Sequence, residues 1–197
     1  MENEVKEPAP KYNYISPEHY LEMERASDVK HEYYKGDVYA MSGASLPHYD
    51  IFHNVYGALT FFLKGKGCKP YGSDLRIHIP QNTLYTYPDI SIICGKPETT
   101  DSFRDNIINP SVIIEILSKS TKDYDRGTKF TLYRNIKTLT EYILIDSTSI
   151  SVEIFTRQKD NSWILTEFKQ LSDSFVITTI NLTPHLTDIY EDVSFDE

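Results

Sequence analysis

Pro110–Tyr133 reads PSVIIEILSKSTKDYDRGTKFTLY, and this stretch decides the fold. Val112–Leu117 is a short run rich in Ile and Val, which is typical of a strand buried on both faces of a sheet. The segment that follows, 121–137, has the apolar spacing of a helix. Carboxylates are almost never fully buried unless they are paired or bind a metal. Glu115, inside the strand, therefore requires a partner.

The flanking segments predict a mixed sheet with helices around it. We expect helices over 17–25, 47–63 and 121–137, a hairpin turning at Lys35-Gly36-Asp37, and strands over 69–79, 86–94, 111–117, 141–146, 150–157 and 162–169. Residues 95–110 predict a mobile loop, and 158–161 a hairpin turn. One crossover helix between groups of strands indicates an α/β fold with a mixed sheet, not an alternating doubly wound one.

Length and composition predict one domain. At 197 residues the chain can bury a core of its own. We expect a flexible leader at 1–13, a single domain at 14–190 and an acidic tail at 191–197. There is no signal peptide and no apolar run of the roughly 18 residues that a membrane helix needs. The sequence therefore favours a cytoplasmic protein with no membrane partner.

Charge and cysteine content narrow the function classes. The net charge of −9 gives no global affinity for nucleic acid, so a polyanion would require a local basic patch or a metal ion. Cys68 and Cys94 form no metal-ligand pattern. Reduced thiols are the expectation for a cytoplasmic chain, with a disulfide as the alternative.

Lys129 falls in the middle of the apolar face predicted for the 121–137 helix. At about 100° per residue, Tyr133 lies within about 40° of it. An ammonium group on a packed face needs a carboxylate, and the short connection folds the helix back over the strand that carries Glu115. Asp125 lies one turn before Lys129, so an ordinary i, i+4 pair between these two is the alternative explanation.

The strand pattern leaves several acids on one side of the sheet: Glu32, Asp74, Asp89 and Glu115. Carboxylates gathered in one place repel strongly unless a divalent cation neutralises them. Oxygen ligands without a Cys/His set favour Mg²⁺ or Mn²⁺ over Zn²⁺. Each acid taken alone is also compatible with a solvated carboxylate at a sheet edge. Together they predict a metal site.

These motifs resemble the Uma-two family, which belongs to the restriction-endonuclease-like superfamily named for its Pro-Asp…Asp/Glu-x-Lys motif. The likeness covers roughly residues 14–190. It rests on Tyr87-Pro88-Asp89-Ile90, Ile114-Glu115-Ile116-Leu117-Ser118, Ser120-Thr121, Tyr124-Asp125-Arg126, Lys129, Tyr133 and Glu141-Tyr142-Ile143-Leu144-Ile145-Asp146, and extends to the 32–37 hairpin, to Gly43 and His48, and to Trp163.

The resemblance implies a restriction-endonuclease-like core and a metal-dependent phosphodiesterase site. By position, Asp89 is the motif aspartate and Glu115 its acidic partner, with Mg²⁺ or Mn²⁺ as the cofactor. Leu117 stands where the motif lysine belongs. The resemblance implies that Lys129 has taken over the role of that lysine, which is the residue that the helical wheel also singles out.

Auxiliary roles follow from the same comparison. Asp74 matches a further acidic position and is expected to assist Asp89 and Glu115 in holding the metal. Glu32 is expected to assist at the same site. His48 is predicted either as an auxiliary acid or base or as a structural residue near a helix start. Arg126 is predicted to touch phosphate or to pair with an acid.

Three functions are compatible with the sequence. The first is a Mg²⁺-dependent endonuclease acting on nucleic acid, DNA above all, as a homodimer, because cutting both strands needs two sites. The second is a catalytically inactive module that keeps the nuclease fold for binding or assembly. The third is a hydrolase of another phosphate ester. For the first, the basic residues along 119–137 and at Lys64, Lys66 and Lys69 would supply the local positive charge.

Overall fold

The structure is a computed structural model that describes residues 13–195. The predicted leader, apart from Asn13, and the last two residues of the predicted acidic tail lie outside the described residues. None of the helices within 13–195 is long and apolar enough to cross a membrane.

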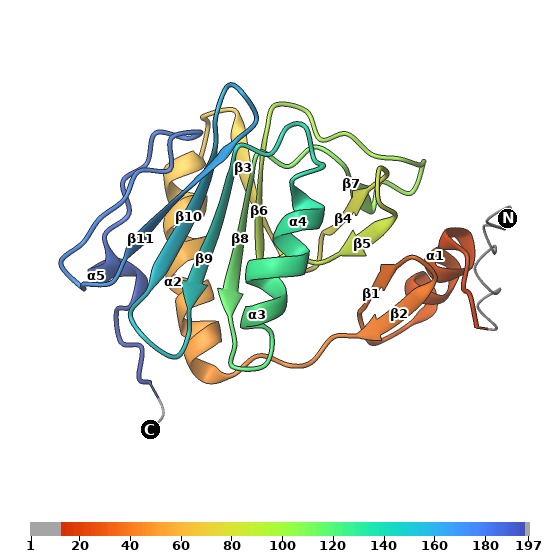
Figure 1. Cartoon of the computed structure of the whole chain (residues 1–197), viewed down its shortest axis with the longest axis horizontal. Coiled ribbons are helices and arrows are strands. Elements are labelled where there is room, and N and C mark those ends of the chain that lie inside the picture. The colour runs from red at the N-terminus through yellow and green to blue at the C-terminus, as the bar shows by residue number, and fades with distance from the viewer. Residues whose placement is uncertain (1–12, 196–197) are drawn as a thin grey trace, which may run out of the picture.

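A mixed six-stranded sheet forms the centre of the molecule (Figure 1). Its strands are β3 (Cys68–Gly72), β6 (Ile90–Cys94), β8 (Val112–Leu117), β9 (Glu141–Asp146), β10 (Val152–Arg157) and β11 (Trp163–Phe168), in the spatial order β11-β10-β9-β8-β6-β3. Only the β8–β9 pair is parallel among these neighbours. The predicted mixed sheet is therefore confirmed, with the stretch that carries Glu115 near its middle.

Helices cover both faces of this sheet (Figure 1). The long helix α2 (Leu46–Leu63) packs Ile51, Val55 and Leu59 against one face, where every second residue of β8 contributes a side chain. The other face carries α3 (Lys122–Tyr124), a π-helical turn η1 (Asp125–Lys129) and α4 (Phe130–Tyr133). Because side chains alternate along a strand, Glu115 faces the same side as Ile113 and Leu117, which pack under α4.

A second sheet lies beside the first. Its strands are β1 (His31–Tyr34), β2 (Asp37–Ala40), β4 (Arg76–Ile79), β5 (Leu84–Thr86) and β7 (Asn106–Ile107), in the order β2-β1-β5-β4-β7. The prediction of one strand over 69–79 is wrong, because a turn at 73–75 divides it into β3 and β4 of different sheets. Apolar side chains of β4 and β5 join the cluster beneath α4, so the two sheets share a core.

The predicted β1–β2 hairpin is confirmed, and glycine is required in its turn. Lys35 and Gly36 both have positive φ angles, 49° and 93°. A Cβ atom at Gly36 would lie 2.2 Å from the Tyr14 ring, so no side chain fits there. The short helix α1 (Pro17–Ala26) begins at Ser16, whose hydroxyl accepts from the His19 amide, and packs Tyr20 against the hairpin. The chain ends beyond α5 (Leu186–Ile189).

Cys68 and Cys94 form a disulfide. They lie opposite each other in the register of the antiparallel β3–β6 pair, with their Cα atoms 4.0 Å apart. The expectation of reduced thiols is therefore wrong. Reduced thiols were expected because the chain was predicted to be cytoplasmic. The register of the β3–β6 pair could not be predicted from the sequence, and it places the two sulfur atoms side by side.

The segment 95–110 is tied to the rest of the molecule. Arg25 of α1 pairs with Asp101 and Asp105 at 2.8 Å each, and Arg76 of β4 pairs with Asp105 at 2.9 Å. The segment also contributes β7 to the second sheet. These contacts attach the predicted mobile loop to α1 and β4.

Replacing Asp105 by asparagine is expected to lower the free energy of unfolding at pH 7 by about 1–3 kcal/mol, since it removes charge-assisted hydrogen bonds to Arg25 and Arg76. The hydrogen bond from Arg25 lowers the pKa of the Asp105 carboxyl. A depressed folded-state pKa gives stability that is present above the unfolded-state value of about 4 and is lost as the pH falls through the folded-state value.

Denaturant unfolding of wild type and Asp105→Asn at pH 7 and at progressively lower pH checks this expectation. The difference between the two proteins should shrink as the pH falls below about 4. Asp28→Asn, which removes an exposed carboxylate just after α1, is the matched control and should match wild type. A difference for Asp105→Asn that stays constant from pH 7 to pH 2 would contradict the assigned role of its charge.

Candidate active site

Lys129 lies at the centre of a group of carboxylates. Its Nζ atom is 3.0 Å from Oε1 of Glu115, 3.2 Å from Oε1 of Glu32 and 3.5 Å from Oδ1 of Asp125. Lys129 is only 6% exposed, and Glu115 4%. We call these four residues the lysine cluster. The predicted carboxylate partner of Lys129 is present, and the i, i+4 alternative with Asp125 holds at the same time.

The residues of the lysine cluster come from three elements that are far apart in the sequence. Strand β8 supplies Glu115 from the central sheet. Strand β1 supplies Glu32 from the second sheet, where the hydroxyl of Thr86 on β5 donates a hydrogen bond to the Glu32 carboxylate. The turn η1 supplies both Asp125 and Lys129. The cluster therefore connects the two sheets through side chains of β1, β8 and η1.

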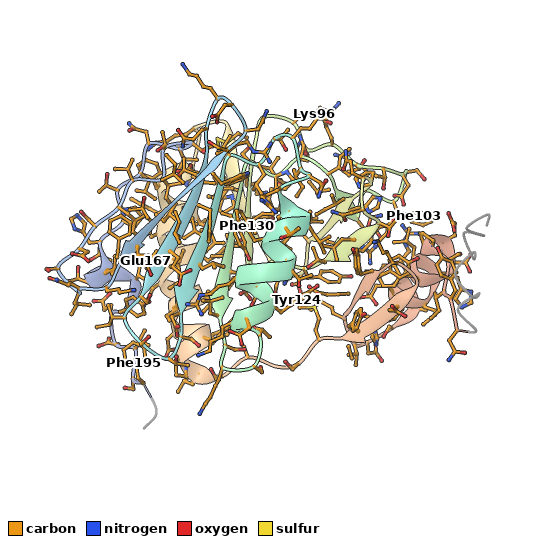
Figure 2. All side chains as sticks on the ribbon, in the orientation of Figure 1. Lys96, Phe103, Tyr124, Phe130, Glu167 and Phe195 are labelled. Carbon is orange, nitrogen blue, oxygen red and sulfur yellow. A yellow bond between two sulfur atoms is a disulfide. The ribbon has the colours of Figure 1, made fainter. Side chains whose placement is uncertain are left out.

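Asp125 and Lys129 stand at the two ends of the π-helical turn, and both are buried. Such turns are rare and occur mostly as single turns inside α-helices, frequently at functional sites. The hydroxyl of Tyr142, on β9, donates to the backbone carbonyl of Asp125 at 3.1 Å and holds the turn against the sheet. Figure 2 labels Tyr124 at the start of this turn, and its ring centroid lies 6.0 Å from Nζ of Lys129.

Asp89 and Glu115 are held side by side on neighbouring strands. The Asp89 backbone amide donates to Oε2 of Glu115 at 3.2 Å, and the Ile116 amide donates to Oδ2 of Asp89 at 2.7 Å. The other Glu115 oxygen accepts from the Tyr133 hydroxyl at 2.8 Å. Each carboxylate is thus fixed by groups of the opposite strand or of α4, which makes the pair rigid.

His48 contacts Asp89 from α2, the helix on the opposite face of the central sheet from α4. Its Nε2 atom lies 3.3 Å from Oδ2 of Asp89, near the start of α2. Burial disfavours the charged imidazole, but the hydrogen bond and the charge of Asp89 outweigh it, so the pKa of His48 is raised. Its Nδ1 atom is buried and has no hydrogen-bond partner among the described residues.

The charges of the lysine cluster are unbalanced. Burial raises the pKa of Glu115 to about 8, against the opposing effect of the Lys129 charge, and burial also raises the pKa of Asp125. Burial opposes the charge of Lys129, but the surrounding carboxylates raise its pKa well above its ordinary value. One ammonium serves three carboxyl groups, so the site favours a further proton or cation.

Asp74 does not reach the site. It lies in the turn between β3 and β4, its side chain is 98% exposed, and it pairs with Lys30 at 3.0 Å. The expectation that it assists Asp89 and Glu115 rested on the family resemblance and on a continuous strand over 69–79. Because that strand is broken at 73–75, the alternation used to place Asp74 beside the other acids does not apply.

The structure also shows the surroundings of Leu117 and Arg126. Leu117, where the motif lysine was expected, is 1% exposed and packs in the core beneath α4. Arg126 pairs with Glu153 at 2.7 Å and lies 3.7 Å from Asp146. The prediction that Arg126 pairs with an acid is confirmed.

Sequence reasoning missed part of the hydrogen-bond network. Tyr133 was seen as a core residue of the helical face, but its hydroxyl binds Glu115. Thr86 was not predicted at the site, and Tyr142 was quoted only within the family motif, although each holds a member of the lysine cluster. Their hydroxyl groups stand in otherwise apolar strand or helix patterns, and this departure from the pattern could have indicated all three residues.

The donor chemistry of the site fits a hard divalent cation. Within residues 13–195, no group of three or more His, Cys, Asp or Glu side chains is arranged to hold a metal ion. Mg²⁺ keeps several waters and is commonly held by one or two carboxylates together with substrate phosphates, so it does not need such a group. Asp89 and Glu115, adjacent and oxygen-bearing, meet that requirement.

Comparisons with known proteins agree with this architecture. A crystal structure from Anabaena variabilis, described as "a putative nuclease belonging to DUF820", superposes with a TM-score of 0.72 at 17% identity, covering 89% of this chain and 97% of that chain. This match shows a shared fold, the restriction-endonuclease-like core with its mixed sheet and flanking helices.

Two uncharacterized proteins of Synechocystis sp. are similar in sequence. The protein slr1290 is 34% identical over 188 residues, covering 95% of this chain and 97% of its own. The protein sll1609 is 34% identical over 148 residues, covering 75% of this chain and 84% of its own. The model of the Uma2 family, described as "Putative restriction endonuclease", matches residues 17–184. The chain therefore belongs to the Uma2 family of nuclease-like proteins.

Proposed function

We propose that this protein is a divalent-metal-dependent endonuclease that hydrolyses phosphodiester bonds of nucleic acid, with DNA as the preferred substrate. The observation that carries the proposal is the Lys129 ammonium, held 3.0 Å from Glu115, on the strand next to Asp89. Buried lysines are rare, and one placed among carboxylates of different elements is typical of a built site. Membership of the Uma2 family supports the same reaction class.

Asp89 and Glu115 are the residues that would hold the metal ion. Mg²⁺ or Mn²⁺ bound there supplies Lewis-acid chemistry and lowers the pKa of a bound water. The hydrogen bonds from Ile116 and Tyr133 orient the two carboxylates toward this task. Mg²⁺ or Mn²⁺ is proposed as the cofactor on the basis of this donor set.

Lys129 supplies the positive charge that the reaction needs at the scissile phosphate. As phosphodiester cleavage proceeds, negative charge develops on the non-bridging oxygens and on the attacking water. An ammonium fixed by Glu32, Glu115 and Asp125 needs no reorganisation to stabilise that charge or to orient the water. His48, hydrogen-bonded to Asp89, is placed to accept or release a proton at the other side of the pair.

A nuclease assay on several substrates tests the proposal. Wild-type protein with Mn²⁺ or Mg²⁺ is incubated with supercoiled plasmid, single-stranded DNA and RNA, and with chelator as the blank. We expect metal-dependent nicking or linearisation of plasmid, and loss of that activity in Asp89→Asn. A folded wild type that cuts none of the three substrates, and that binds neither metal in calorimetry, would exclude the endonuclease.

One observation favours the alternative of a non-catalytic binding or assembly module. Lys129 already compensates part of the carboxylate charge, so the cluster is held together by protein groups alone. The calorimetric measurement separates the two functions, because the module requires no metal at Asp89 and Glu115.

We further propose that the protein acts as a homodimer through β11. This strand forms one edge of the central sheet, and it exposes Ile164 (53%) and Leu165 (47%). Exposed apolar residues on an unpaired edge strand favour pairing with a second strand. Light scattering of wild type and Ile164→Lys tests this, with a dimer expected only for the wild type; a monomeric wild type would contradict it.

A further inference from the structure

A polar cleft lies where the end of α4 meets β10 and β11, and no residue of the lysine cluster lines it. It has a volume of about 360 Å³ and is lined by Thr131, Arg134, Asn135, Arg157, Asn161 and Trp163. We call it the arginine pocket. Its residues come from α4 and the residues after it, from the end of β10, from the β10–β11 turn and from the start of β11. No acidic residue lines it, in a chain whose net charge is −9.

Arg157 is unusual among the arginines of the protein. Its Nη2 atom donates to the backbone carbonyls of Arg134 and Ile136, at 2.8 and 2.9 Å, while its Nε atom is buried and has no partner among residues 13–195. No ion pair between described residues involves Arg157. A partly buried guanidinium whose charge is not compensated by a carboxylate favours an anion beside it.

Arg134 adds a second guanidinium to the same cleft. Its side chain is exposed and rests over the Phe130 ring, 5.2 Å from the ring centroid, with one hydrogen bond of 3.3 Å to the Thr131 hydroxyl. Figure 2 shows Phe130 on the side of the helix that faces β9 and β10. Phe130 packs against Phe155 of β10, at 4.2 Å between ring centroids. Arg134 is therefore held at the pocket by aromatic packing and not by an acid.

Trp163 forms the wall of the pocket beside Arg157. The Arg157 guanidinium lies 4.8 Å from the centroid of the Trp163 ring, and the Phe130 ring meets it edge-on at 87°. The Trp163 ring and the two backbone carbonyls together fix the position of the guanidinium, whose positive charge remains without a carboxylate partner. Asn161, in the β10–β11 turn with a φ angle of 65°, brings a further polar side chain to the rim.

We propose that the arginine pocket binds a phosphate group of a nucleic-acid strand, outside the scissile position. The two guanidinium groups supply the charge, and Asn161 and Thr131 supply polar contacts. The choice of nucleic acid as the source of the phosphate rests on the proposed function. Arg134 follows Lys129 by five residues, about 7 Å along a helix axis but on another side of the helix, so a nucleic-acid strand would meet the arginine pocket outside the lysine cluster.

The single tryptophan of the chain makes the pocket directly observable. Any change in its fluorescence reports on Trp163, which lines the pocket. The probe is a mixed-sequence single-stranded oligodeoxynucleotide of twelve residues, titrated in the presence of EDTA so that no cleavage is needed. Inorganic phosphate is titrated in parallel to distinguish a free anion from a nucleic-acid phosphate.

We expect the oligonucleotide to change the Trp163 fluorescence saturably and to bind far more tightly than inorganic phosphate. Arg134→Gln and Arg157→Gln should each weaken oligonucleotide binding by about 5- to 10-fold and reduce the slope of log K against log salt by roughly 0.7–1. Lys169→Gln, which removes an exposed charge just beyond the other end of β11, is the control and should change affinity less than about twofold.

Arg157→Gln also removes hydrogen bonds to the end of α4, so Arg134→Gln, an exposed position, keeps the test valid if the first variant fails to fold. Wild-type affinity in both folded arginine variants would overturn the proposal. Equal affinity for phosphate and oligonucleotide would overturn the nucleic-acid assignment. If the protein binds the oligonucleotide through these arginines but cuts no substrate, the arginine pocket is supported and the endonuclease activity is excluded. If the protein cuts its substrate but both arginine variants bind the oligonucleotide as wild type does, only the proposal for the pocket is excluded.

Discussion

Replacing Glu115 by glutamine is expected to abolish metal binding and to slow cleavage by at least about 100-fold, the effect known when even the groups that orient metal ligands are removed. Glu115 touches both halves of the proposed site, since Oε2 accepts from the Asp89 amide and Oε1 lies 3.0 Å from Nζ of Lys129. A neutral amide has a similar shape but lacks the charge that binds a divalent cation.

The same substitution should leave the fold intact. Burial raises the pKa of Glu115, which means that the folded protein favours the neutral form of this side chain. We therefore expect the free energy of unfolding of Glu115→Gln to lie within about 1.5 kcal/mol of wild type in metal-free buffer. Lys129 keeps Glu32 and Asp125 as partners in this variant.

Calorimetric titration with Mg²⁺, a plasmid cleavage assay and denaturant unfolding check the three parts of this prediction. Glu167→Gln, an exposed carboxylate on β11, is the control and should behave as wild type in all three. A folded Glu115→Gln protein that binds Mg²⁺ with wild-type affinity would remove Glu115 from the metal site. Severe unfolding would instead show that its charge is structural.

Replacing Lys129 by methionine is expected to destabilise the metal-free protein by about 3–5 kcal/mol, the cost of leaving buried charges without their partner. The methionine fills the space of the lysine stem, but Glu32, Glu115 and Asp125 then face each other without an ammonium. The cost of burying these carboxyl groups without that charge, as mutual repulsion or as protonation of Glu115, is the expected cause, rather than lost packing.

A double-mutant cycle distinguishes these causes. If this cost dominates, Glu115→Gln should restore part of the stability lost in Lys129→Met, because it removes one carboxyl group that must be either buried as a charge or protonated. The coupling free energy should reach about 1–3 kcal/mol. Urea unfolding at pH 8 of wild type, both single variants and the double variant measures it. Additive effects would show that Lys129 and Glu115 do not interact as the geometry indicates.

The fold was largely predictable because its elements are strongly patterned. Val112–Leu117 and Glu141–Asp146 are apolar runs of strand length, and they form the parallel pair at the middle of the sheet. Helix α2 begins and ends close to the predicted 47–63. The errors arose where a local pattern continued across a change of sheet, as at 73–75, since alternation alone does not show that a strand has ended.

The candidate site was predictable in part, for a physical reason. Lys129 and Glu115 each violate the hydrophobic pattern of a buried element, and such violations are expected at functional sites. Strand alternation placed Asp89 among the other acids, but its role as the motif aspartate came only from the family resemblance. The π-helical turn, the hydroxyls of Thr86 and Tyr133, and the disulfide depend on tertiary contacts that no spacing encodes.

The central claim is that Lys129, reaching the site from the helix after β8, does the work of the motif lysine that Leu117 replaces. The most direct test is single-turnover cleavage of plasmid DNA in Mn²⁺ by wild type and Lys129→Met, each shown to be folded at the assay temperature by circular dichroism. We predict that the variant cleaves about 100- to 1,000-fold more slowly, as when one preorganised charge-stabilising group is lost. A folded Lys129→Met protein that cleaves at the wild-type rate would contradict the claim.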